Sequence, residues 1–145
     1  MKIRPMVISD YADVYALWLS CRGMGLNQPD DSREGVEKFL NRNPGTCFVA
    51  EDGAIVGAIM AGHDGRRGYI YHASVHPEYR HQHIGARLAE ASMTGLAEQG
   101  ITKAALVVFD RNETGNAFWE RLGFAVRNDL IYRNKALADI QRIDT

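Results

Sequence analysis

Basic and glycine residues follow an apolar run in the middle of the chain, and their spacing suits the binding of an anion. The run from Gly68 to Val75 stops before Pro77, and a polar loop from Arg80 to Gly85 follows. The next segment has apolar residues at helical spacing: Ile84, Leu88, Ala91 and Leu96. The first amides of such a helix have no intrahelical partners, and its dipole favours negative charge there. We therefore predict a phosphate or pyrophosphate site at this turn. Additional positive charge would come from Arg80, Arg87, His81 and His83.

The loop also resembles a motif of a known family. Arg80-x-x-His83-x-Gly85 after Val75-x-Pro77 is similar to the acyl-CoA pyrophosphate loop of the GCN5-related N-acetyltransferases (GNAT family), usually Arg/Gln-x-x-Gly-x-Gly/Ala. This chain departs from the motif at His83, which stands at the first glycine position. A β-carbon there would crowd a pyrophosphate, although the amide can still donate if its backbone dihedrals are ordinary.

A second block carries the same resemblance. Residues 112 to 124, Asn-Glu-Thr-Gly-Asn-Ala-Phe-Trp-Glu-Arg-Leu-Gly-Phe, resemble the family's Asn-x-x-Ala-x-x-Phe/Leu-Tyr-Glu-x-Leu-Gly-Phe segment. The two motifs and the order of elements cover roughly residues 3 to 124. The Asp-Gly-x-Arg-Gly turn at 64–68 and the Asn27-x-Pro29 loop further resemble a small bacterial YpeA-like subgroup. The resemblance to RimI-like ribosomal-protein acetyltransferases is partial.

The pattern of apolar residues, caps and turns predicts an α/β (α+β) chain of order βααβββαβαββ. It has a mixed central sheet with helices on both sides, and the resemblance implies a parallel strand pair that splays apart to admit acyl-CoA. Asp52-Gly53 between two apolar runs is a strong hairpin signal. The predicted strands are residues 2–7, 46–51, 54–61, 69–75 and 103–110, with two short ones in 124–133. The predicted helices are residues 9–21, 31–41, 86–99 and 114–122, with Asp31 or Ser32 as the cap of the second, and residues 23–31 form a loop.

Length and composition set limits on the function. With 145 residues, 46% apolar and 24% charged, we expect one globular domain over residues 1–145, and the resemblance implies that it is an N-acetyltransferase domain. A net charge of −1 argues against nucleic acid as a partner. We find no signal-peptide pattern or membrane-length apolar run, and Cys21 and Cys47 make no disulfide framework, so we expect a cytoplasmic protein. For Cys21 we favour a small buried residue over a catalytic nucleophile. We expect a monomer or homodimer.

The resemblance implies acetyl-CoA as the acetyl donor and an amine as the acceptor. It implies that the backbone near Ser74 and Val75 holds the thioester or pantetheine, and that the amides of residues 81–86 hold the pyrophosphate. Asn112 is either a helix cap or a pantetheine contact, and residues 116, 118 and 119 would line the CoA channel. The complete set of expected cofactor residues is Ser74, Val75, Arg80, His81, Gln82, His83, Ile84, Gly85, Ala86, Asn112, Asn116, Phe118 and Trp119.

The expected acetyl transfer needs a base that removes a proton from the acceptor amine. A lysine-like amine, with a pKa of about 10.4, is almost entirely protonated at pH 7, so a side chain or a water chain must remove a proton. The predicted strand 69–75 lacks the carboxylate that many family members use, and Tyr69 stands at that position. His72 is the best candidate base by its ordinary pKa, and a structural role in the sheet is the competing interpretation. Strand alternation places His72 and Tyr71 on opposite faces unless a bulge intervenes.

The residue that would protonate the departing CoA thiolate is also not identified by the sequence. Trp119 stands where relatives often have a tyrosine that protonates the CoA thiolate, and an indole cannot do so. Tyr132 is a candidate substitute, and water is another. The catalytic candidates are therefore His72, Tyr71 and Tyr132, with His63 and Asp64 no better supported.

Three functional hypotheses follow. The first is an acetyl-CoA-dependent N-acetyltransferase in which a primary amine, on a small molecule or a protein N-terminus, attacks directly in a ternary complex. The second is a non-catalytic acetyl-CoA sensor or regulatory module, and the third is an unrelated anion-binding α/β protein. Zinc binding by His76, Glu78, His81 and His83 is disfavoured because the spacing is loose and no cysteine contributes, so we expect no metal.

Overall fold

A computed structural model describes residues 1–143 of the chain. A five-stranded sheet runs through the molecule in the order β1-β3-β4-β5-β6, and a two-stranded sheet joins β2 and β7. The strands are β1 (Lys2–Pro5), β2 (Asn27–Gln28), β3 (Phe48–Glu51), β4 (Ile55–His63), β5 (Gly68–Val75), β6 (Ala104–Ala105) and β7 (Gln141–Arg142). The helices are α1 (Tyr11–Leu19), α2 (Arg33–Arg42), α3 (Ile84–Glu98) and α4 (Glu113–Arg121), with 3-10 turns η1 (Ile8–Asp10) and η2 (Pro77–Tyr79). The predicted mixed sheet between helices is confirmed.

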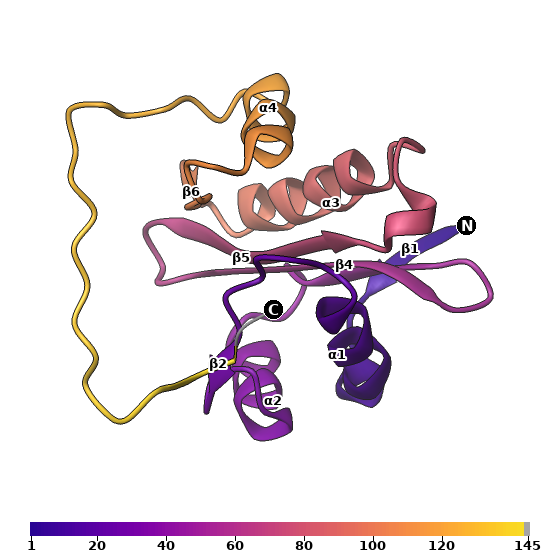
Figure 1. Cartoon of the computed structure of the whole chain (residues 1–145). Coiled ribbons are helices and arrows are strands. Elements are labelled where there is room, and N and C mark those ends of the chain that lie inside the picture. Colours follow the sequence, from indigo (N-terminus) through magenta and orange to yellow (C-terminus); the bar gives the residue numbers. More distant parts are fainter. Residues whose placement is uncertain (144–145) are drawn as a thin grey trace.

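Two helical layers enclose the main sheet. Figure 1 shows α1 and α2 on one face and α3 and α4 on the other. Each layer has its own core: Trp18 of α1 and Val36 of α2 belong to the first, and Leu88 and Leu96 of α3 to the second. Strand β4 serves both, since its residues from Val56 to Gly62 are all buried. No helix within residues 1–143 is long and apolar enough to span a membrane.

Local sequence signals explain most of these elements. The Asp52-Gly53 turn joins β3 and β4 as predicted, with Gly53 at φ 74°. Ser32, one of the two residues proposed as a cap, begins α2 by accepting a hydrogen bond from Gly35 N at 3.0 Å. The antiparallel β4–β5 pair is irregular in the middle, because Ile59 lies opposite Ala73 while Ala61 lies opposite Ile70. Two residues of β5, Tyr71 and His72, thus face one residue of β4, which is a β-bulge.

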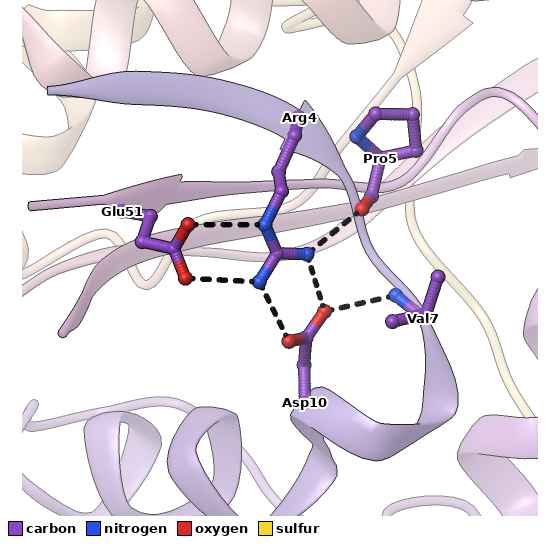
Figure 2. Close-up of polar contacts among 5 residues, drawn as sticks. All are labelled: Arg4, Pro5, Val7, Asp10 and Glu51. Carbon is purple, nitrogen blue, oxygen red and sulfur yellow. Dashed lines mark hydrogen bonds and ion pairs between the residues drawn. The ribbon is translucent and has the colours of Figure 1, made fainter. Parts of the chain in front are cut away.

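A charged network fastens the first strand to the first turn. Figure 2 shows the Arg4 guanidinium between two carboxylates, those of Asp10 and Glu51. The bonds to Asp10 are short, at 2.8 and 2.9 Å, and Asp10 also accepts the Val7 amide at 2.9 Å. The hydrogen bonds from Arg4 hold the pKa of Asp10 below its ordinary value. The network therefore joins β1, η1 and β3 at one edge of the main sheet.

The C-terminal part differs from the prediction. Only Ala104–Ala105 of the expected strand 103–110 forms a strand, and the predicted short strands in 124–133 are absent from the described chain. A strand requires a neighbouring strand, and residues 124–140 instead run in an extended path that leaves α4 and returns to β2 (Figure 1). There β7 pairs with β2, within the segment predicted to be a loop.

Candidate active site

The site begins where two parallel strands separate. Strands β5 and β6 pair only at Gly68 with Ala104 and at Tyr69 with Ala105. Strand β5 continues to Val75, whereas the chain after Ala105 leaves the ladder. We call the region between β5 residues 70–75 and residues 106–112 the strand fork. It matches the predicted splayed pair, and it places unpaired backbone of β5 beside the loop that follows it.

The loop at the end of β5 has an unusual backbone. His83 adopts φ 62° and ψ 16° just before α3, and His81 has φ 65°. Both values lie in the left-handed region, which side chains with a β-carbon disfavour. The condition of ordinary dihedrals at residue 83 is therefore not met: the position has the conformation that a glycine adopts most easily. The loop still leads directly into the N-terminus of a 15-residue helix, where an anion is favoured.

The expected basic residues do not all gather there. Arg80 donates from Nε to the Val75 carbonyl at 3.3 Å, and one of its terminal nitrogens lies 3.9 Å from Cys21 Sγ. Arg80 thus lies across the end of β5, next to the fork. Arg87 instead lines a hollow between α3 and strands β1 and β3 with Glu90. Its contribution to the anion site stays a prediction.

Gly85 has a packing role that its motif position did not reveal. A β-carbon on Gly85 would lie 3.2 Å from two ring atoms of Phe118 in α4. The glycine therefore lets α4 approach the first turn of α3. Ile84 also belongs to packing, since its side chain is buried in the core under α3, while its amide remains on the loop.

Helix α4 presents fewer free groups to the fork than predicted. Asn112 caps it, with its side-chain oxygen accepting from Gly115 N at 2.9 Å. Asn116 donates to the carbonyls of Phe109 and Asn112, and so holds the turn before the helix. Phe118 and Trp119 form an edge-on pair, and Trp119 packs on the core and against Phe124. In this structure these four side chains cap α4, hold the turn before it and pack it against the core.

Two residues near the fork were not anticipated. Phe109 lies beside Gly23 in the loop after α1, and the Arg111 guanidinium carbon sits 4.3 Å from the Phe109 ring centroid. This cation–π contact leaves a permanent positive charge on the α4 side of the fork. Neither residue lies in a recognisable motif, so only the folded chain reveals them.

The bulge in β5 brings two catalytic candidates to one face. Tyr71 packs edge-on against Phe39 of α2, and His72 packs edge-on against Trp18 of α1. Both helices lie on the same face of the sheet (Figure 1). The bulge is the exception that the prediction from strand alternation allowed, and it puts Tyr71 and His72 on the same face because it shifts the pleat by one residue.

His72 has a carboxylate partner. Its Nε2 lies 2.8 Å from Asp31 Oδ1, and both side chains are largely buried. The sequence suggested Asp31 only as a cap for α2, and the separation of 41 residues gave no local signal for the pair. The other carboxylate oxygen of Asp31 accepts the Asn27 amide at 2.8 Å.

Tyrosine rings lie on the face of the sheet that α2 covers. The rings of Tyr69 and Tyr71 lie 4.7 Å apart. Desolvation of these partly buried rings raises the pKa of both phenols, and the nearby phenol of Tyr132 adds to the increase. The side chain of Tyr132 is itself mainly exposed.

The geometry supports neither a metal centre nor a cysteine nucleophile. Within residues 1–143 no group of three or more His, Cys, Asp or Glu side chains could hold a metal ion, so His76, Glu78, His81 and His83 form no zinc-type site. Both cysteines are buried, and burial raises the pKa of the Cys47 thiol to about 11. His63 accepts the Gly65 amide and Asp64 accepts those of Arg66 and Arg67, which are ordinary turn contacts.

Comparisons with known proteins agree with this geometry. Residues 11–124 match the model of the acetyltransferase (GNAT) family. An acetyltransferase of Sodalis glossinidius is 33% identical over 143 residues, covering 97% of this chain and 99% of that protein. Among solved structures, Ard1 of Thermoplasma volcanium is similar with a TM-score of 0.76 at 20% identity, covering 87% of this chain and 83% of that one. The PaiA N-acetyltransferase of Thermoplasma acidophilum, solved with coenzyme A, has a TM-score of 0.74 at 20% identity, covering 87% and 90%.

Proposed function

This chain belongs to the acetyltransferase (GNAT) family, and we propose that it transfers the acetyl group of acetyl-CoA to a primary amine by direct attack in a ternary complex. The observation that carries the proposal is the strand fork, whose β5 arm ends at the loop before α3. A fork exposes backbone hydrogen-bonding groups that a pantetheine chain can pair with, and the helix N-terminus favours a pyrophosphate.

Acetyl-CoA fits the fork if Arg80 changes partner. In the structure Arg80 bonds the Val75 carbonyl. A pyrophosphate at residues 81–86 would attract the guanidinium, because charge-assisted bonds to phosphate are stronger than bonds to a neutral carbonyl. The move would leave the Val75 carbonyl free for an amide of the pantetheine arm. Arg80 would thus link anion binding to the opening of the β5 edge.

The acceptor side offers an environment that suits an amine. Tyr69, Tyr71, Phe39 and Tyr132 supply aromatic surface, and Asp30 lies close enough to Tyr71 to raise its pKa. Aromatic faces and carboxylates both attract an ammonium group. Once the amine is neutral, alignment with the thioester supplies much of the acceleration, and the CoA thiol is a good leaving group because its pKa is only about 8.5.

A second candidate function is a non-catalytic acetyl-CoA-binding module. It is favoured by Trp119, which cannot protonate a thiolate and which packs on the core. The two functions differ in turnover, not in binding.

The test is calorimetric titration with acetyl-CoA, followed by an assay of free CoA thiol with a panel of primary amines. Arg80→Ala should weaken acetyl-CoA binding about tenfold or more, as expected for loss of a charged hydrogen bond. Arg66→Ala, in the turn between β4 and β5, is the matched control and should bind like the wild type. Gly85 is a poor choice of variant, because its substitution would push against Phe118.

The outcomes separate the hypotheses. Amine-dependent release of CoA supports the transferase. Binding without turnover for every amine supports the regulatory module. Absence of acetyl-CoA binding by the wild type would refute both.

A further inference from the structure

We propose that His72, oriented by Asp31, accepts the proton that the acceptor's ammonium group must lose before attack. The inference rests on the proposed transferase function and assigns one step of it. The first support is the pair itself, with His72 Nε2 2.8 Å from Asp31 Oδ1. A carboxylate accepts hydrogen bonds, so Nε2 carries the ring proton and Nδ1 keeps a lone pair. The basic atom of the ring is therefore Nδ1.

Asp31 is held firmly enough to orient the ring. Its second carboxylate oxygen accepts the Asn27 amide at 2.8 Å. Its backbone carbonyl accepts the Tyr11 hydroxyl at 2.7 Å, and its own amide donates to the Asn27 carbonyl at 2.9 Å. These contacts fix Asp31 from α1 and from β2. A histidine whose far nitrogen is fixed in this way keeps one tautomer and one ring direction.

His72 Nδ1 is one of a few buried polar atoms that have no hydrogen-bonding partner among the described residues. Among the described residues, the buried side-chain polar atoms without a hydrogen-bonding partner are Trp18 Nε1, His72 Nδ1 and Ser74 Oγ. The rings of Trp18 and His72 are 4.9 Å apart, and Ser74 follows His72 by two residues on β5, which places both on the α1 face of the sheet. All three atoms therefore lie in the layer between α1 and β5.

The three atoms are complementary in kind. The indole can only donate, Nδ1 can accept, and the serine hydroxyl can do both. Buried polar atoms are nearly always paired, and an ordered water with two to four such neighbours is the usual solution. A water here would accept from Trp18 and donate to Nδ1. It would connect His72 to Ser74, whose backbone lies on the arm of the fork where the thioester is proposed to sit.

The proton balance of the step is complete. The ammonium gives one proton through this hydrogen-bonded path to Nδ1, and the imidazolium that forms is stabilised by the Asp31 carboxylate. The neutral nitrogen forms a C–N bond with the thioester carbonyl carbon, the C–S bond breaks, and CoA leaves as a thiolate. The second nitrogen proton goes to the thiolate, and His72 returns its proton to solvent. The products are the acetamide, CoA thiol and one proton.

Several titratable groups besides Asp31 contact the neighbours of His72. In α1, Tyr15 packs against Trp18 and Tyr11 bonds the Asp31 carbonyl, with Glu34 of α2 near Tyr11. After α1, Cys21 Sγ lies 3.7 Å from the Val75 carbonyl oxygen. Tyr71 lies beside His72 on β5, with Asp30 near it. Asp31 is the one that bonds the ring directly.

The experiment is the pH profile of kcat/KM for an amine that the wild type acetylates. We expect His72→Gln to lose the ascending limb of the profile and about 10²-fold of the rate, as for a general base, with acetyl-CoA affinity unchanged. Asp31→Asn should lose part of the rate, because the ring is then no longer held by a carboxylate, with acetyl-CoA affinity also unchanged. His63→Gln, at a half-buried histidine that ends β4, is the matched control and should keep the wild-type profile.

An independent readout uses the wild type alone. The ¹⁵N spectrum of the neutral His72 ring should show the Nε2–H tautomer. An Nδ1–H tautomer would overturn the proposal even if the variants fail to fold, and so would an unchanged profile in His72→Gln. A wild type that binds acetyl-CoA but acetylates no amine would instead refute the transferase function, so the two failures are distinguishable.

Discussion

Replacing His83 with glycine should stabilise the protein, because it removes strain that the loop backbone now carries. His83 has φ 62°, and a left-handed residue with a β-carbon costs about 1–2 kcal/mol. Glycine removes that cost but makes the unfolded chain more flexible, which opposes the gain by about 0.4–1 kcal/mol. The net expectation is a stabilisation of about 0.5–1 kcal/mol. For a chain of this size that is a rise in Tm of about 2–3 °C.

The assay is urea denaturation with scanning calorimetry on three proteins. His83→Ala is the matched control, since alanine loses the imidazole but keeps the β-carbon and its left-handed cost. We expect His83→Gly to be more stable than the wild type, and His83→Ala to show no such gain. Acetyl-CoA titration should show binding by His83→Gly at least as tight as by His83→Ala, because no β-carbon then faces the pyrophosphate.

One result would refute this reasoning. If His83→Ala gains as much stability as His83→Gly, the backbone conformation is not the source of the strain. The imidazole ring itself would then be unfavourable, through its contacts with the loop.

Two further substitutions test the scaffold around the site. Asp10→Asn should destabilise by about 1–3 kcal/mol at pH 7, through loss of charged hydrogen bonds. Because the pKa of Asp10 is lowered in the folded state, its contribution is present at neutral pH and is lost as the pH falls below its ordinary value of 3.8; the variant should lose this part of the acid sensitivity in urea titrations. The exposed Asp129→Asn is its control and should show no measurable change. Gly95→Ala should destabilise by about 1–3 kcal/mol in the same assay, since a β-carbon would overlap the carbonyl of Gly45, whereas Thr94→Ala on the exposed side of α3 should stay within about 0.5 kcal/mol of the wild type. Equal losses in a variant and its control would contradict either explanation.

Local patterns predicted the parts of the fold that local interactions determine. The Asp52-Gly53 hairpin, the cap at Ser32 and the strand–loop–helix unit from Gly68 to Glu98 all follow from residues within a few positions of one another. The same holds for the loop motif, because a turn and the helix after it are adjacent in sequence. These elements position most of the candidate cofactor site.

Local sequence patterns could not predict the features that depend on residues far apart in the chain. The bulge that turns Tyr71 and His72 to one face is a property of the β4–β5 register, which no residue type announces. The pairing of His72 with Asp31 joins segments 41 residues apart. The expected strand 103–110 failed for a related reason, since apolar alternation gives a strand only where a partner strand continues beside it.

The left-handed loop shows a third limit. The motif indicated that a glycine usually stands at residue 83. It did not indicate whether His83 would adopt an ordinary backbone conformation or the strained left-handed one. The structure has the left-handed one at both His81 and His83.

The short pairing between β5 and β6 divides the molecule into parts of unequal stability. Strands β1, β3, β4 and β5 are joined by long antiparallel ladders, whereas β6 is attached to β5 over two residue pairs. We expect backbone amides in the first group to exchange only when much of the protein unfolds, and those of Ala104 and Ala105 to exchange through local opening of lower free energy. The β6 side of the fork could therefore open locally, against the packing of Trp119 and Phe124 on the core, while the β5 side stays fixed. A long, flexible donor could then enter from the side of the chain rather than by threading between two rigid walls.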